Sequence, residues 1–350
     1  MRETEWIPNS ENPVPRRAFP GQTTPDVART WRRDSGPRYH PPPMTRPVLI
    51  VFNPVSGRGE AARFATELAT ALEARGASAE LLETRADRDV FASIDPHLYR
   101  SVVVVGGDGS FHAAVNGLRA LETPLGFGGT GTVNVLSLEQ GLSDAPGDVA
   151  RLLHEGRTAE VPLFAANGRR WVLFAEAGFL GTIVRRVNRW RTRTGKHGKT
   201  EFVTTALRVL PLAWGRPIQA VLETCDGRRL AREYSNVLAT RARLYAGNMR
   251  LPMDGVDLTS AHFQVIGFRT RTPFGHLALL GLARLGALPL LRGLLTRLGL
   301  LDCIPCRGLA IEGPRAAGVH LDAESTVGST ELQLPLRVDG TQHSIQLLVP

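Results

Sequence analysis

The stretch that decides the fold is VVVVGGDGSFHAAVN, residues 102–116. An apolar run typical of a buried strand ends here in a turn that contains Gly106, Gly107 and Gly109. Glycines permit steep turns and a close approach to a ligand, and the helix-like pattern that follows would direct unpaired N–H groups toward an anion. Asp108 stands where a carboxylate could hold Mg²⁺ or orient a hydroxyl. The stretch predicts a phosphate-binding turn, with an ordinary strand-to-helix turn as the alternative.

Strands and helices alternate on both sides of this turn. VLIVF at 48–52 predicts a buried strand that leads into a polar glycine loop at 53–59. The other predicted elements are a helix through Phe64, Leu68 and Leu72 that ends at Gly76, a strand at 79–83, a helix near 87–94, a strand at 124–128 and a glycine loop at 128–134 with a helix after it. Such alternation predicts an α/β domain with a doubly wound parallel sheet, whose glycine loops lie together at the carboxyl ends of the strands.

The pattern changes after about residue 160. Short apolar segments bounded by turn residues predict a second, mainly β domain with the form of a sandwich or meander. These segments are 171–179, 218–224, 235–240, 263–268, 309–313, 319–324 and 345–349. A leucine-rich interval, 276–301, is divided by Arg284, Pro289, Arg292 and Arg297 into runs too short to span a bilayer. It predicts two helices, which either cover the β core or lie on a membrane surface.

Composition narrows the class of protein. The 350 residues carry a formal charge of +9, almost all of it from arginine, because lysine occurs only at Lys196 and Lys199. Arginine-rich surfaces suit phosphates, anionic lipid headgroups or nucleic acid, although a high-GC genome would give the same bias. Residues 1–46 are rich in proline and arginine, which predicts a disordered basic tail. The tail has no apolar secretory segment, so we expect cytoplasmic residence.

The three cysteines are too few for a disulfide scaffold. Cys303 and Cys306 form a single CxxC. Two interpretations remain open for this pair: a zinc or redox site, or small buried apolar side chains. A GxxxxGK[ST] phosphate loop is absent, and the glycine loops do not match a dinucleotide fingerprint, so phosphate would be bound by unusual loops.

The motifs taken in order resemble those of the diacylglycerol kinase catalytic-domain family, which includes bacterial lipid kinases and sphingosine kinases. In the first domain they are Asn53-Pro54 with Ser56-Gly57, Thr84, Gly106-Gly107-Asp108-Gly109-Ser110, Pro124-Leu125-Gly126 and Gly131-Thr132-Val133-Asn134. Later matches are Ala177-Gly178-Phe179, residues 195–210, Tyr245 through Pro252, and Asp322-Ala323-Glu324. The resemblance covers residues 46–350 and leaves out the tail.

This resemblance implies an ATP-dependent kinase that phosphorylates a lipid hydroxyl with Mg²⁺ as cofactor. It implies a nucleotide-binding domain at 47–160 and a β-rich lipid-substrate domain at 161–350. Glu324 would be the general base, assisted by Asp108 and Asp322 through Mg²⁺ or hydrogen bonds. The residues implied at the ATP site are Asn53, Ser56, Gly57, Thr84, Gly106, Gly107, Asp108, Gly109, Ser110, Gly131, Thr132 and Asn134.

The chain departs from the family pattern at several positions. Leu180 stands where many members have aspartate, and Ala323 replaces a glycine. The segment after Pro252 lacks the family's Asp-Asp-Gly, and neither Asp254 nor Asp257 can be assigned as a metal ligand. Ser110 in place of threonine keeps the hydroxyl. These changes leave room for a weak or inactive kinase.

Three functions therefore stay open: a lipid kinase, an NAD kinase-like enzyme, and a nucleotide-binding regulatory protein with little activity. Val135 after Asn134 argues against the NAD kinase, whose pattern has Asn-Glu at this point. The basic segment 185–199 includes Trp190, which favours either an anionic membrane surface or a solvated loop, while nucleic acid is disfavoured because no readout helix is recognisable. We expect a peripheral membrane protein, and a homo-oligomer is compatible with the sequence.

Overall fold

The computed structural model describes residues 46–85, 89–143, 145–194, 204, 208, 217–270, 272–314, 317–322, 324, 326–327 and 330–350. The predictions for the basic tail, for Ala323 and for most of the segment 195–210 lie outside these residues.

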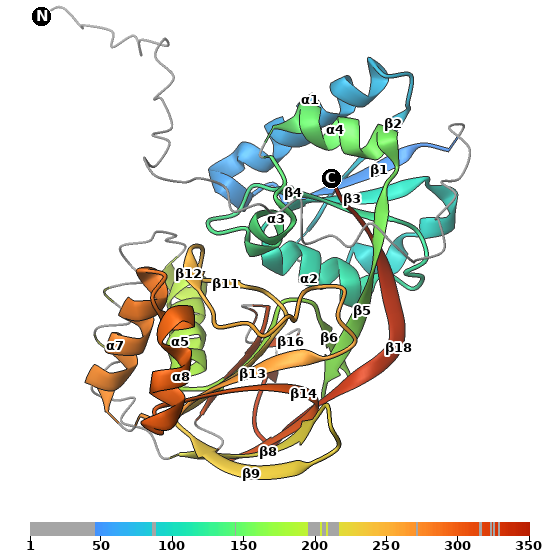
Figure 1. Cartoon of the computed structure of the whole chain (residues 1–350). Coiled ribbons are helices and arrows are strands. Elements are labelled where there is room, and N and C mark those ends of the chain that lie inside the picture. Colours follow the sequence, from blue (N-terminus) through green and yellow to red (C-terminus); the bar gives the residue numbers. More distant parts are fainter. Residues whose placement is uncertain are drawn as a thin grey trace, which may run out of the picture.

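The N-terminal part is a parallel sheet with helices on both faces (Figure 1). Its strands are β1 (Val48–Phe52), β2 (Ala79–Glu83), β3 (Ser101–Gly106) and β4 (Leu125–Gly129), in the spatial order β2-β1-β3-β4. One face packs on α1 (Glu60–Glu73) and α4 (Pro146–Glu155), the other on α2 (Asp108–Gly117) and α3 (Val135–Gln140). Because both faces are covered, β3 is buried along its whole length. The predicted doubly wound sheet is confirmed.

The predicted helix near 87–94 is wrong for the residues that the structure describes there. Two 3₁₀ turns, Phe91–Ser93 and Pro96–Leu98, occupy this connection. The side chain of Asp89 accepts the N–H of Phe91 at 3.1 Å, and Asp95 accepts the N–H of His97 at 3.1 Å. These local hydrogen bonds compete with a helix, and Pro96 disfavours helical backbone at the residue before it.

Two long antiparallel strands, β5 (Thr158–Ala166) and β18 (Leu336–Leu348), run from the N-terminal sheet into the C-terminal part (Figure 1). At its end β18 pairs in parallel with β4, through Leu347 and Leu125. The last residues of the chain therefore complete the first sheet. A division near residue 160 falls inside β5, and the domain boundaries stay a prediction.

The C-terminal part is largely strands, as predicted. Its main strands are β6 (Arg169–Trp171), β7 (Phe174–Gly178), β8 (Ile218–Thr224), β9 (Arg229–Tyr234), β10 (Asn236–Thr240), β13 (Phe263–Phe268), β14 (Leu301–Glu312) and β15 (Gly318–Leu321). Two small hairpins add β11 (Leu244–Tyr245) with β12 (Met249–Arg250), and β16 (Thr326–Val327) with β17 (Thr330–Glu331). The main strands join the sheet of the first part and curl around one shared apolar core.

Three of the described helices, α5 (Phe179–Thr194), α7 (Pro273–Arg284) and α8 (Leu288–Arg297), pack against this part (Figure 1). The leucine-rich interval forms α7 and α8, which confirms the two predicted helices. Residues 185–194, for which a solvated loop was one interpretation, belong to α5. Ile183 and Val187, four positions apart, are buried and attach that helix to the core. None of the described helices is both long and apolar enough to cross a bilayer.

The CxxC pair is split between two cores. Residues three apart on a strand point to opposite faces, and Cys306 packs in the core of the curled sheet while Cys303 packs on the helix-covered side. Burial raises the pKa of each thiol to about 12. Among the described residues no three His, Cys, Asp or Glu side chains could hold a metal together. The pair thus behaves as small apolar side chains.

The contact of β18 with β4 predicts that the first sheet depends on the end of the chain. Leu347 is fully buried, so Leu347→Ala should lower the free energy of unfolding by about 2–5 kcal/mol. Leu98→Ala is the matched control, because Leu98 is 62% exposed and its truncation should cost less than about 0.5 kcal/mol. Urea unfolding followed by circular dichroism measures both. Equal midpoints for Leu347→Ala and the unaltered chain would contradict the prediction.

Candidate active site

Three glycine loops meet at the carboxyl ends of β1, β3 and β4, which are neighbours in the sheet. The first and third loops touch through hydroxyls, since Thr130 Oγ1 donates to Ser56 Oγ at 3.2 Å. They also touch through backbone: Gly57 has φ +61°, and a Cβ there would collide with the carbonyl oxygen of Thr130. The first loop can therefore lie against the third only with glycine at position 57.

The second and third loops pack backbone to backbone. The N–H groups of Thr130 and Gly131 both donate to the carbonyl oxygen of Gly106, at 2.8 and 3.2 Å. A Cβ on Gly131 would lie 2.7 Å from the Cα of Gly107, closer than atoms pack. Glycines at these positions let the two turns form one continuous surface of backbone.

Asn53 joins the first loop to the second. Its N–H donates to the carbonyl oxygen of Val105 at 3.0 Å, and its side-chain oxygen accepts the N–H of Val55 at 3.2 Å. Two other predicted residues lie at the margin of this assembly. Thr84 stands at the end of β2, where its N–H donates to Phe52, and the side chain of Thr132 is exposed.

Asp108 fixes the third loop to the second. Its two carboxylate oxygens accept the N–H groups of Val135 and Leu136, at 2.9 and 3.0 Å, in the first turn of α3. Burial raises the pKa of Asp108, although these two hydrogen bonds act in the opposite direction. Asn134, just before that turn, has φ +52° and donates to the carbonyl oxygen of Gly131, while its buried Oδ1 has no partner. The geometry gives Asp108 a positioning role.

Asp322 anchors the turn that follows β15. Its carboxylate accepts three consecutive backbone N–H groups, from Val172 at 2.9 Å, Leu173 at 2.7 Å and Phe174 at 2.8 Å. It also lies 3.1 Å from Nδ1 of His112 on α2. Burial alone would raise the pKa of Asp322, but the hydrogen bonds from His112 and the backbone outweigh it, and the pKa falls below its usual value. Asp322 thus joins the C-terminal turn to both parts of the molecule.

Glu324 is brought to the second glycine loop by this turn. Its backbone pairs with Leu321 through two hydrogen bonds of 2.8 Å. Its side chain lies against Gly109, where a Cβ would collide with Oε1 of Glu324. Within the part of the chain that the structure describes, its carboxylate accepts no hydrogen bond. It therefore differs from Asp108 and Asp322, whose oxygens are occupied by N–H donors.

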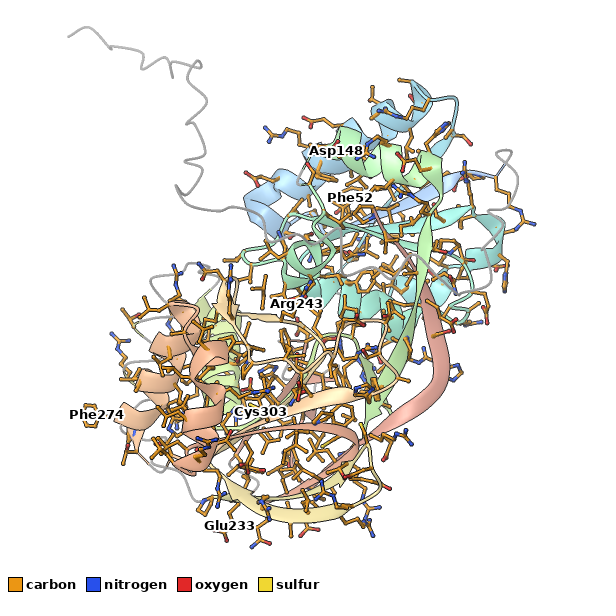
Figure 2. The ribbon with its side chains drawn as sticks, viewed as in Figure 1. Phe52, Asp148, Glu233, Arg243, Phe274 and Cys303 are labelled. Atoms are coloured by element: carbon orange, nitrogen blue, oxygen red, sulfur yellow. The ribbon has the colours of Figure 1, made fainter. Side chains whose placement is uncertain are left out.

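Sequence reasoning missed a second support of the third loop. Glu139 on α3 accepts the N–H of Leu244 at 2.6 Å and pairs with Arg243 at 3.3 Å. Burial raises the pKa of Glu139, although Arg243 acts to lower it. Gly247 of the same hairpin lies against Val133. Figure 2 shows Arg243 where the two parts of the molecule meet.

The positions that depart from the family pattern also have places in the structure. Leu180 is buried in the core, and its N–H donates to Oδ1 of Asn236 at 2.9 Å. Asp257 accepts hydrogen bonds from Thr259 within its own loop, and Asp254 pairs with Arg292 at 3.4 Å. Leu180 is therefore a packing residue here, and neither aspartate is part of the glycine-loop assembly.

Comparison with known proteins identifies the first part of the chain. Residues 47–166 match the family model of the diacylglycerol kinase catalytic domain. This part of the chain is similar to that catalytic domain. A search of curated proteins finds no matching sequence.

Solved structures extend the likeness of fold beyond residues 47–166. A candidate diacylglycerol kinase from Bacillus anthracis str. Sterne is 18% identical, with a TM-score of 0.61, over 87% of this chain and 97% of its own. A second structure, described as a diacylglycerol kinase from the same organism, is 16% identical with a TM-score of 0.59 over the same shares. At these identities the likeness establishes the fold alone.

The network around Asp322 predicts a pH-dependent stability. A carboxylate whose pKa is lower in the folded state stabilises the protein above its unfolded pKa, about 3.9, and that contribution is lost as the pH falls through the folded pKa. Asp322→Asn should lower the free energy of unfolding by about 2–4 kcal/mol at neutral pH. The difference from the unaltered chain should shrink below about pH 4.

Chemical unfolding at a series of pH values tests this prediction. Asp148→Asn is the control, because its carboxylate is 48% exposed and, among the described residues, pairs with Arg151 at the surface. A penalty for Asp322→Asn that stays constant from neutral pH down to pH 3 would argue against an ionised Asp322 in the folded state.

Proposed function

We propose that this protein is an ATP-dependent kinase that transfers the γ-phosphate to a hydroxyl of a lipid, such as diacylglycerol, a sphingoid base or a related bacterial lipid. The observation that carries the proposal is the position of Glu324. A carboxylate without hydrogen-bond partners among the described residues lies against Gly109, in the middle of the glycine turn. The match of residues 47–166 to the diacylglycerol kinase catalytic domain, together with the fold, supports the same class of enzyme.

The glycine loops have features that suit a nucleoside triphosphate. Two of the turns approach each other at Gly107 and Gly131 without side chains between them, and α2 begins directly after Gly107. Exposed backbone at the start of a helix is a favourable place for phosphate. The buried and unpartnered Oδ1 of Asn134 is a polar group that a bound nucleotide could satisfy. We assign the phosphates to the turn 106–110, with Asn53, Ser56 and Asn134 around them.

Mg²⁺ fits this site less well than ATP does. The oxygens of Asp108 and Asp322 accept backbone N–H groups, and the described residues contain no cluster of three metal-binding side chains. Mg²⁺ is commonly held by one or two carboxylates together with substrate phosphates. We propose that it binds mainly through the nucleotide, where its charge would offset that of the phosphate oxygens.

In the proposed reaction Glu324 accepts the proton of the lipid hydroxyl. The hydroxyl oxygen forms a bond to the γ-phosphorus, the bond from that phosphorus to the bridging oxygen breaks, and ADP leaves. Gly109 leaves room for the carboxylate, Asp322 holds the turn that carries it, and Asp108 holds the third loop in place. An anionic membrane surface is the partner that we propose, because a lipid substrate resides there.

Removing the proposed proton acceptor should separate turnover from binding. Glu324→Gln keeps the size of the side chain, so ATP affinity should stay within about twofold while kcat falls about 10²- to 10⁴-fold. Transfer of labelled phosphate to lipid in detergent micelles measures kcat, and calorimetry measures ATP binding. Glu312→Gln, at an exposed position of β14, is the control. Unchanged turnover in Glu324→Gln would exclude this residue from the reaction.

The same assay with different acceptors tests the class of enzyme. Diacylglycerol, a sphingoid base and NAD are offered separately with ATP and Mg²⁺. Transfer to a lipid supports the proposal, and transfer to NAD alone would replace it with an NAD kinase-like activity. ATP binding with no transfer to any acceptor would favour a regulatory protein.

Gly109→Ala should impair activity without weakening the fold. An added methyl group would displace the carboxylate of Glu324, so kcat should fall at least about tenfold. Alanine at a helical position favours the helix by up to about 1 kcal/mol, so thermal stability should be equal or higher. Gly147→Ala on α4 is the matched control, because a Cβ there meets nothing within 4 Å. Full activity in Gly109→Ala would show that Glu324 need not lie where the structure has it.

A further inference from the structure

Exposed apolar side chains are concentrated in one short segment. Of the thirteen large hydrophobic side chains that are exposed among the described residues, eight lie between residues 274 and 300. We call them the α7–α8 patch: Phe274, Leu277, Leu285, Leu290, Leu291, Leu294, Leu298 and Leu300. Phe274, Leu285 and Leu290 are 78%, 82% and 85% exposed, and Figure 2 shows Phe274 projecting outward from α7. So many exposed apolar side chains in one place are uncommon on the surface of a soluble protein, and such a patch marks an interaction site.

The patch is an outer face of helices whose inner faces already form core. On α7, His276, Leu279 and Ala283 are buried, while Phe274 and Leu277 point outward at helical spacing. On α8, Leu288 and Leu295 are buried, while Leu290, Leu291 and Leu294 are exposed. A surface helix normally carries polar residues on its solvent face. The apolar outer faces therefore need an explanation other than packing within the chain.

All charged side chains of the segment that carries the patch are positive, and one of them, Arg292 of α8, pairs with Asp254 at 3.4 Å. Asp and Glu are absent from residues 269–301 of the sequence, while Arg284 and Arg297 are exposed beside the leucines. Helix α5 has no acidic residue either, and its Arg186 and Arg193 are exposed. Phe179, at the start of α5, contacts His276 of α7, and Figure 1 shows α5, α7 and α8 gathered on one side of the molecule. Apolar side chains rimmed by arginine complement the hydrocarbon and the anionic headgroups of a bilayer.

A short series of contacts connects the patch with the glycine loops. Helix α7 packs on β12, and Arg250 of that strand lies beside Gly286 after α7. At the tip of the same hairpin, Gly247 lies close to Val133 in the third glycine loop, since a Cβ on Gly247 would be 3.6 Å from the side chain of Val133. A surface bound to α7 and α8 would thus be linked to the candidate active site through one hairpin.

We propose that the α7–α8 patch is the surface by which this protein docks on an anionic phospholipid bilayer. Helices α7 and α8 lie in the plane of the interface, with their outer leucines and Phe274 in the apolar layer and their arginines at the headgroups. The inference rests on the proposed function, because it explains how the enzyme reaches a substrate that resides in the bilayer.

Vesicle sedimentation without ATP tests the docking surface. Leu290→Gln/Leu294→Gln changes two exposed side chains and should lower the affinity for phosphatidylglycerol–phosphatidylcholine vesicles at least about tenfold. Leu98→Gln, an exposed leucine on the N-terminal part, is the matched control and should bind as the unaltered chain does. Arg284→Gln/Arg297→Gln should weaken binding to these vesicles but not to neutral ones, and it should reduce the loss of binding on addition of salt.

Several results would overturn the proposal. One is vesicle binding by Leu290→Gln/Leu294→Gln that equals that of the unaltered chain, and another is an unaltered chain that does not bind. Sedimentation velocity without lipid tests whether a second copy of the chain covers the patch instead. An unaltered dimer that the leucine variant converts to a monomer, with no change in vesicle binding, would assign the patch to a second copy of the chain.

The kinase assay in detergent micelles distinguishes failure of this proposal from failure of the proposed function. The leucine variant should keep its transfer rate in micelles and lose it on vesicles, because only the vesicle assay requires docking. Loss of vesicle binding in a protein that transfers phosphate to no lipid would leave the docking surface intact and reject the kinase. Equal transfer on vesicles by both proteins would reject the docking surface and leave the kinase intact.

Discussion

The candidate active site depends on the hydrogen bonds of one buried carboxylate. Asp322 accepts the N–H groups of residues 172–174 and lies beside His112 on α2, so it ties together a strand entry, a helix of the first part and the turn that carries Glu324. These segments lie up to 210 positions apart in the sequence. A buried charge with this many donors is stable only when all of them are in place. The position of Glu324 is thereby linked to correct folding of both parts of the molecule.

The strand that leads into this turn is held by a second buried carboxylate. Glu176 on β7 accepts hydrogen bonds from Asn236 on β10 and Tyr245 on β11, and it pairs with His320 on β15. Tyr245 belongs to the hairpin that also supports the third glycine loop through Arg243 and Leu244. Because Glu176 contacts β10, β15 and this hairpin, the same buried carboxylate supports both the strand before Asp322 and the hairpin that holds the third loop.

Local patterns made the first part of the fold predictable. The apolar runs at 48–52 and 102–105 and the glycine turns after them required only neighbouring residues, and the structure has strands and loops there. The connection at 91–98 was mispredicted because the side chains of Asp89 and Asp95 bond their own backbone, which a helical pattern does not reveal. Segment 185–194 carries many arginines, and Val187 is its buried apolar position among the described side chains, so little in the sequence indicated that the segment is helical.

Long-range partners could not be predicted in this way. The pairing of Glu139 with Arg243 and the acceptance of two α3 N–H groups by Asp108 join residues with no fixed spacing. Glu324 became a candidate only through the resemblance of its motif to a family, because a single glutamate near the end of a chain has no local signature of a catalytic role.

Two of the three carboxylates of the site hold backbone in place, and the third, Glu324, is the proposed proton acceptor. Asp108 and Asp322 are surrounded by N–H donors, yet the pKa of Asp108 is raised because burial dominates, while that of Asp322 is lowered because more donors face it. Carboxylates held in this manner fix backbone and have little freedom to take up a proton from a substrate. Glu324 is only partly buried and lies against a glycine, where a hydroxyl could reach it. Among the described residues of the site, the carboxylate without hydrogen-bond partners thus lies beside backbone that the other two hold in place, and this arrangement suits the proton acceptor that we propose.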